Sequence, residues 1–141
     1  MHIAENLSDI SLHYFNLARQ IASKFDLTLS QALVLLYIPF DGITISHLSH
    51  KLGVDISTMT RNIQRIEKKG FLERILNADD KRSVKLLLSS KGQKISTSLN
   101  EEIKNHIHEI INKYDIDKSQ SINNNLETLS WDLYLYRENI K

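Results

Sequence analysis

The segment from residue 44 to residue 70 restricts the fold of this chain more than any other stretch. Its sequence, TISHLSHKLGVDISTMTRNIQRIEKKG, spaces apolar residues at helical intervals in two blocks, one on each side of Gly53. Thr44 and Asp55 are candidate N-caps of the two blocks. Gly53 and Gly70 stand just past the ends of the blocks, where glycine is favoured. Two helices joined by so short a turn form a helix-turn-helix, which we therefore predict for this segment.

The residues on either side of this motif predict a short helix before it and a β-hairpin after it. Ser30 is a plausible N-cap for a helix over residues 30–38, and Pro39 prevents that helix from continuing. The stretch FDGIT that follows is predicted to be a turn. Residues 72–76 and 84–88 are predicted to form two short strands around NADDKRSVKL (77–86), whose charges are typical of an exposed hairpin tip. Ser89 is placed to cap the next helix.

Three longer segments carry apolar residues at spacings of three and four, which places each set along one face of a helix. This apolar surface exceeds what a core built from the middle of the chain could cover. We therefore expect these helices to pack on one another and on a second copy of the chain. An ordinary helical bundle within one chain is the alternative. The three sets are Ile3, Leu7, Ile10, Tyr14, Leu17 and Ile21; Ile95, Leu99, Ile103, Ile107, Ile110 and Tyr114; and Ile122, Leu126, Leu129, Leu133, Tyr136 and Ile140.

Length and composition restrict the class of protein. A chain of 141 residues, 41% of them hydrophobic, favours a single domain. The absence of cysteine excludes disulfides, thiolate catalysis and cysteine-ligated zinc. We expect a cytoplasmic protein without membrane contact, because the sequence has neither a signal-peptide pattern nor an apolar run of about eighteen residues. We also expect no enzyme, since there is no glycine-rich phosphate loop, nucleophile motif or recognisable pair of catalytic acids.

The near-neutral charge of the whole chain hides a basic centre. From His47 to Lys91 the sequence has ten Lys or Arg residues against five acids, whereas the remaining residues have eight against twelve. A basic centre between mildly acidic ends is typical of a local surface that binds a polyanion.

The second helix of the predicted motif concentrates this basic character on one face. Residues placed 100° apart put Met59, Ile63 and Ile66 in a narrow arc that would face the core. The opposite face has guanidinium, ammonium, amide and hydroxyl groups and no acid, because Glu67 falls to its side. Such groups suit the major groove and the phosphates of double-stranded DNA. The alternative is a face that grips an acidic protein, although protein interfaces favour large apolar and aromatic side chains.

Four stretches of the sequence resemble the winged-helix transcriptional regulators of the MarR (multiple antibiotic resistance regulator) family, over residues 27–92. LTLSQALVLLYI resembles the second helix of the family, and ISHLSHKLGVDISTMTRNIQRIEKKGFLER resembles its helix-turn-helix. DKR (80–82) and LSSKG (88–92) resemble the Asp-x-Arg motif of its wing and the sequence that follows the wing. The helix-turn-helix match rests on Leu48, Leu52, Gly53, Ser57, Thr60, Arg61, Gly70 and Arg74.

The resemblance implies a mostly α-helical fold with a small β-hairpin wing. A winged helix-turn-helix lobe over residues 28–91 would be flanked by dimerisation helices at 1–26 and 92–141. Such regulators are homodimers that read a pseudo-palindromic operator, often as repressors. Their recognition helix enters the major groove, and the wing arginine, Arg82 here, reaches the adjacent minor groove, whose negative potential attracts guanidinium.

The expected DNA-binding residues lie on the second helix of the motif and on the hairpin. They are Ser57, Thr58, Thr60, Arg61, Gln64, Arg65, Lys68, Arg74, Asp80, Lys81 and Arg82. We expect Asp80 to orient the guanidinium of Arg82 or Arg74 by a charge-assisted hydrogen bond rather than to touch DNA. Asp79 has no role in this scheme beyond solubility. Two departures from the family pattern are Ser49 in place of alanine, and His47, which weakens a capping box with Thr44.

Many members of the family release DNA when a small phenolic or carboxylate ligand binds. His13, Tyr14, Arg19 and Tyr37 are the candidate ligand-binding residues, although Tyr14 could equally belong to the core and Arg19 to the solvated surface. We expect no metal site and no cofactor. His106 and His108 are two residues apart on a helix and so point to different faces.

Overall fold

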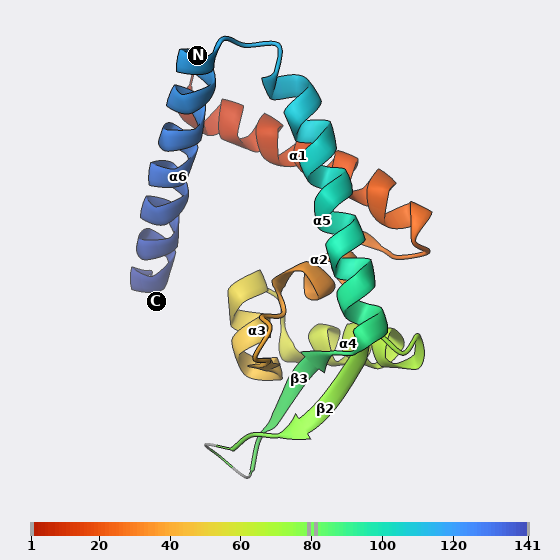
Figure 1. Cartoon of the computed structure of the whole chain (residues 1–141). Helices are drawn as coiled ribbons and strands as arrows, with labels where there is room; N and C mark the ends of the chain where they lie inside the picture. The colour runs from red at the N-terminus through yellow and green to blue at the C-terminus, as the bar shows by residue number, and fades with distance from the viewer. Residues whose placement is uncertain (1, 79, 81, 141) are drawn as a thin grey trace. The chain divides into compact units, whose positions relative to one another are not determined.

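The computed structural model describes residues 2–78, 80 and 82–140 (Figure 1). These residues divide into two compact units, 1–103 and 104–141, which are described separately. They form six α-helices and a three-stranded antiparallel sheet, which confirms the predicted fold class. The elements are α1 (Ile3–Lys24), α2 (Leu29–Tyr37), β1 (Ile43–Thr44), α3 (Ile45–Leu52), α4 (Ile56–Lys68), β2 (Leu72–Leu76), β3 (Val84–Leu88), α5 (Ser90–Ile111) and α6 (Ile116–Asn139).

Side-chain caps begin the helices of the predicted motif. The hydroxyl of Thr44 accepts the backbone N–H of His47 at 3.2 Å, and Asp55 accepts that of Thr58 at 2.9 Å, so both predicted N-caps are confirmed. Gly53 ends α3 in a left-handed conformation with φ of 66°, which glycine adopts without a steric penalty. The helix-turn-helix is therefore the pair α3–α4.

The predicted cap of α2 is wrong. Thr28, not Ser30, caps this helix, because its hydroxyl accepts the N–H of Gln31 while the Gln31 side chain accepts the N–H of Thr28. This reciprocal pair satisfies two backbone N–H donors at once, which a lone serine at position 30 would not do. At the start of α5 the prediction holds, since Ser89 Oγ accepts the N–H of Gly92 at 3.0 Å.

The sheet has the strand order β1-β3-β2, and only part of it was predicted. Strands β2 and β3 match the predicted hairpin, with Leu72 opposite Leu88 and Leu76 opposite Val84. Strand β1 lies where a turn was predicted. The prediction missed it because two residues are too few to show the alternating pattern of a strand. Its pairing with β3 ends at the Thr44–Lys85 pair, so beyond this point the hairpin continues as two strands (Figure 1).

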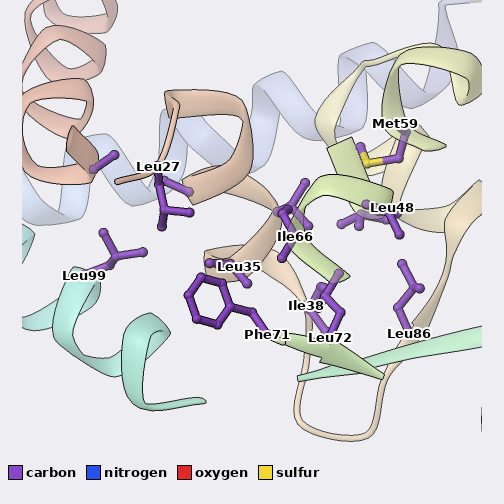
Figure 2. Close-up of a cluster of buried hydrophobic side chains, with 14 of the residues drawn as sticks. Leu27, Leu35, Ile38, Leu48, Met59, Ile66, Phe71, Leu72, Leu86 and Leu99 are labelled. Carbon is purple, nitrogen blue, oxygen red and sulfur yellow. The ribbon is translucent and has the colours of Figure 1, made fainter. Parts of the chain in front are cut away.

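One hydrophobic core holds the first unit together (Figure 2). Met59, Ile63 and Ile66 of α4 are at most 1% exposed, which confirms the predicted inward face of that helix. Helix α5 reaches this core at its N-terminal end, where Gly92 lies so close to the chain that a Cβ atom would stand 2.0 Å from the carbonyl oxygen of Phe71. This contact explains why glycine occupies that place in the LSSKG stretch.

The second unit leaves apolar side chains in solvent. Helix α6 begins at Asp115, whose carboxylate accepts the N–H of Lys118 at 2.8 Å, and none of its residues is buried. Four residues of the predicted stripe of α6 are exposed, including Leu133 at 45% and Tyr136 at 68%, and the other two, Ile122 and Leu129, are half-buried. A second apolar set (Trp131, Tyr134 and Leu135), which the single-stripe prediction missed, lies on the opposite side of the helix by its spacing.

None of the helices in the described part of the chain has the length and apolarity that a membrane span requires.

Candidate nucleic-acid interface

Helix α4 presents a polar surface opposite its buried face. Five of its predicted DNA-binding side chains are exposed, and two threonines are half-buried. One of these, Thr60, donates its hydroxyl hydrogen to the carbonyl of Ile56 at 2.8 Å, so it points along the helix rather than outward. The single acid of α4 is Glu67, which is half-buried near its C-terminal end. The exposed side chains are Ser57, Arg61, Gln64, Arg65 and Lys68.

A small hydrogen-bond network holds Arg61 over the first turn of α4. Thr58 Oγ1 donates to Asp55 Oδ2 at 2.7 Å, and Arg61 Nη2 donates to Thr58 Oγ1 at 3.3 Å. The backbone N–H of Thr58, followed by its hydroxyl, lowers the pKa of the Asp55 carboxyl, and the charge of Arg61 adds to this effect. Asp55 is therefore ionised at neutral pH, so it both caps the helix and orients the hydroxyl that Arg61 contacts.

The hairpin tip is closed by hydrogen bonds among Asn77, Asp80 and Ser83. The N–H of Asn77 donates to the Ser83 carbonyl at 3.1 Å, and its side-chain amide donates to Ser83 Oγ at 2.9 Å. The N–H of Ser83 in turn donates to the Asp80 carbonyl at 3.1 Å. Asn77 is buried although it lies close to the tip, so these bonds tie the two ends of the turn together.

The role expected for Asp80 needs correction. Its Oδ1 accepts the backbone N–H of Arg82 at 2.9 Å, which is a short-range turn contact and not a bond to a guanidinium. Asp80 thus shapes the main chain that carries Arg82, and the Arg82 side chain is exposed. Lys81, the other predicted hairpin cation, and Asp79 lie outside the described residues.

Arg74 bonds to α4 at the base of the hairpin. Its Nε and Nη2 donate to Glu67 Oε1 at 2.9 Å and 2.6 Å, and these bonds raise the pKa of the guanidinium. Arg74 was one of the two guanidinium groups, with Arg82, that Asp80 was expected to orient, and Glu67 was expected to lie to the side of the polar face of α4. The Glu67–Arg74 pair could have been predicted from the short turn at Gly70, because this turn reverses the chain direction and brings β2 past the C-terminal end of α4.

A cavity of about 340 Å³ lies within the first unit, between α1, α2 and α3. Tyr14 and Tyr37 line it as predicted, and burial together with nearby Tyr37 raises the pKa of the Tyr14 hydroxyl. Lys51, which the sequence did not suggest, joins them with its Nζ 5.4 Å from the centre of the Tyr37 ring. The remaining lining residues are Ile10, Ser11, Phe15, Leu33 and Leu52.

The other two candidate ligand-binding residues lie away from this cavity. Arg19 is exposed and donates to Asn16 Oδ1 at 2.7 Å, and His13 is exposed without lining the cavity. His13 precedes Tyr14 and Arg19 follows it in the sequence, and at 100° per residue both point to other sides of α1. Within the described residues, no three histidine, aspartate or glutamate side chains come together as metal ligands would.

Comparison with known proteins decides the family. A family model described as the MarR family matches residues 27–84. The HTH-type transcriptional regulator SarZ of Staphylococcus saprophyticus subsp. saprophyticus is 30% identical over 100 residues, which cover 70% of this chain and 66% of that protein. The multiple antibiotic resistance protein MarR of Escherichia coli K12 is 32% identical over 98 residues, which cover 69% of this chain and 68% of that protein.

This chain belongs to the MarR family. The crystal structure of apo MarR from E. coli superposes with a TM-score of 0.80 over 92% of this chain and 96% of that one, at 24% identity. The S. aureus MepR–DNA complex superposes with a TM-score of 0.74 over 94% of this chain and 98% of MepR, at 20% identity. These matches show that the fold is the winged helix of MarR-family structures, with β2–β3 as its wing.

The sequence matches to the MarR-family relatives are shorter than the structural ones. They span about two thirds of SarZ and of E. coli MarR, at 66% and 68%, and half of another relative. Of the two named relatives, SarZ is a transcriptional regulator by name.

Proposed function

We propose that this MarR-family chain is a dimeric, sequence-specific DNA-binding transcriptional regulator that acts as a repressor. The exposed face of α4 carries the proposal, because its cations, amide and hydroxyls face solvent with no carboxylate among them. The relatives named as transcriptional regulators and the similar MepR–DNA complex support it. A face that grips another protein is the weaker alternative, since cations stand where protein interfaces place aromatic and apolar anchors.

Each part of the interface suits a different part of the duplex. On α4, Arg61 or Arg65 can donate two hydrogen bonds to guanine, and Gln64 can exchange two with adenine in the major groove. Ser57 and Thr58, in the first turn, suit phosphate contacts. Arg82, carried on the narrow wing, suits the minor groove beside the one that α4 would enter.

Dimerisation would explain the exposed apolar helices. The N-terminal half of α1 leaves Ile3 75% and Ile10 53% exposed, and α6 exposes Trp131 at 59% on one side and Leu133 at 45% on the other. Surfaces of this kind are seldom left in water by a soluble protein. A second copy would also supply the second recognition helix that a pseudo-palindromic operator requires, about 34 Å or one helical turn of DNA from the first.

The cavity suits a small aromatic carboxylate or phenol as effector. Tyr14 and Tyr37 offer aromatic faces and hydroxyls, and Lys51 offers a cation to a carboxylate. Benzoate is a simple probe of this site. We expect it to weaken DNA binding by the native protein and to have a smaller effect on a Lys51→Met variant, whereas equal effects on both would place the effector elsewhere.

The test of the proposed function is footprinting on fragments of the source genome combined with a salt titration. We expect protection of a pseudo-palindromic site and a steep loss of affinity as salt rises, because phosphate contacts release counterions. If the native protein protects no site on any fragment, the chain is not a sequence-specific regulator.

A further inference from the structure

Glu67 is an acid in a surface that otherwise suits a polyanion. It belongs to α4, the helix proposed to enter the major groove, and its carboxylate is paired with Arg74 of β2 at 2.6 Å and 2.9 Å. Both side chains are partly exposed, at 27% and 37%. An unpaired carboxylate here would repel phosphates, and an unpaired Arg74 would attract them. Because the two charges neutralise each other, the pair has little net effect on the attraction of phosphates. Its presence at the interface therefore needs another explanation.

The position of the pair in the sheet supplies that explanation. Arg74 lies opposite Leu86, and Leu86 also pairs with Ile43 of β1. Toward the tip, β1 contributes one more residue, and then β2 and β3 continue alone through the pair of Leu76 and Val84. Arg74 is thus bonded to α4 close to where the hairpin loses the support of its third strand.

Little packing supports the hairpin beyond Arg74. Ile75 is 41% exposed and Leu76 is 72% exposed, so these two apolar side chains anchor the wing only weakly. The β2–β3 ladder, the Asn77–Ser83 bonds and the contact of Asp80 with the Arg82 N–H link the described residues of the projecting part to one another. A change of direction at its base would therefore be transmitted to Arg82 at the tip.

We propose that Glu67 is a positioning residue for DNA binding, which fixes the direction of the wing relative to the recognition helix through Arg74. The inference rests on the proposed function. Arg74 then acts as the link between α4 and the wing and not as a phosphate contact. Glu67 sets where Arg82 meets the duplex when α4 is seated in the major groove, and its own carboxylate touches no base.

The test is a double-mutant cycle on the footprinted operator with Glu67→Gln and Arg82→Ala. Removing a carboxylate near DNA would by itself strengthen binding, so a loss of affinity in Glu67→Gln separates positioning from simple charge. We expect each single variant to bind roughly tenfold more weakly. The double variant should bind no more weakly than Arg82→Ala, since a misdirected wing makes no contact to lose. Multiplied losses, or an unchanged or tighter Glu67→Gln variant, would overturn the inference.

Two controls make the cycle specific. Glu67→Gln combined with Arg61→Ala should show multiplied losses, because Arg61 contacts DNA from α4 itself and does not depend on the wing. Adding Arg74→Ala to the Arg82→Ala variant should leave the salt dependence unchanged, whereas a further fall of about one in its slope would make Arg74 a phosphate contact. Thermal unfolding of Glu67→Gln should be near that of the native protein, as is usual for partly exposed ion pairs.

The same experiment separates the inference from the function on which it rests. If the native protein protects no operator, the proposed regulator function fails and the positioning role fails with it. If the native protein binds its operator and Arg82→Ala weakens binding, but the losses multiply, only the positioning role fails.

Discussion

Ser49 is the residue at which the sequence and the packing of the lobe disagree. It is 4% exposed, and its hydroxyl has no hydrogen-bond partner among the described residues. A buried hydroxyl without a partner loses its hydration and gains nothing in return. Alanine, which the resemblance described above leads us to expect at this place, would avoid the cost. A substitution that removes the Ser49 hydroxyl should therefore increase the free energy of unfolding.

We predict that Ser49→Ala raises the free energy of unfolding by about 1 kcal/mol. The matched control is Ser96→Ala, which should lower it, because Ser96 Oγ donates to the Leu35 carbonyl at 3.0 Å. Urea unfolding of the two variants measures both effects. A less stable Ser49→Ala variant would mean that the hydroxyl does form a hydrogen bond in solution.

Arg61 is the side chain for which a sequence-specific contact to a DNA base can be tested most directly. It is exposed on α4 and is oriented by Thr58 before any DNA is present. We expect Arg61→Ala to cost about 1 to 3 kcal/mol of binding free energy on the operator and less on unrelated DNA. Lys94→Ala, which removes an exposed cation from α5, is the control for charge alone. Equal losses on both DNAs would make Arg61 a phosphate contact.

At the scale of elements, α4 depends on an ionised cap. The pKa of the Asp55 carboxyl is lowered from its usual 3.8, first by the backbone N–H of Thr58. Because the folded pKa lies below the unfolded one, the charge stabilises the native state above pH 3.8, and this contribution is lost as the pH falls through the lowered value.

The prediction that follows concerns the acid side of the stability curve. The difference in free energy of unfolding between the native protein and an Asp55→Asn variant should be constant near neutral pH and should shrink below about pH 4. Urea titrations at a series of pH values measure that difference. A difference that persisted unchanged into strong acid would contradict the role of the charge.

The elements that could be predicted are those whose signal is local. The α3–α4 pair followed from apolar spacing, two caps and Gly53, all within one short stretch. Strand β1 did not, because its pairing with β3 is decided by residues far along the chain. The Glu67–Arg74 pair was not predicted for the same reason, because which side chains meet depends on where β2 passes α4. Of the ligand candidates, Tyr14 and Tyr37 meet at the cavity, but Lys51 comes from the helix-turn-helix, where the sequence pointed only to DNA.

For the whole molecule, the two apolar sides of α6 lead to a prediction about assembly. If a second copy covers both sides, Trp131→Glu and Leu133→Glu should each weaken the dimer, although they lie on opposite sides of the helix. Sedimentation equilibrium measures the dissociation. Asn123→Glu, an exposed polar position on the same helix, should leave the dimer unchanged. A native protein that sediments as a monomer would contradict the dimer itself.

The position of the cavity between α1, α2 and α3 has a consequence for the effector concentration to which the protein would respond in a cell. Lys51 and Leu52, at the end of α3, belong both to the wall of the cavity and to the helix that precedes α4. An effector that lowered DNA affinity from there would have its own affinity lowered by the same factor whenever DNA was bound. The threshold concentration of the effector would then depend on how many operator copies the cell contains, so the number of genes regulated would tune the sensitivity of the response.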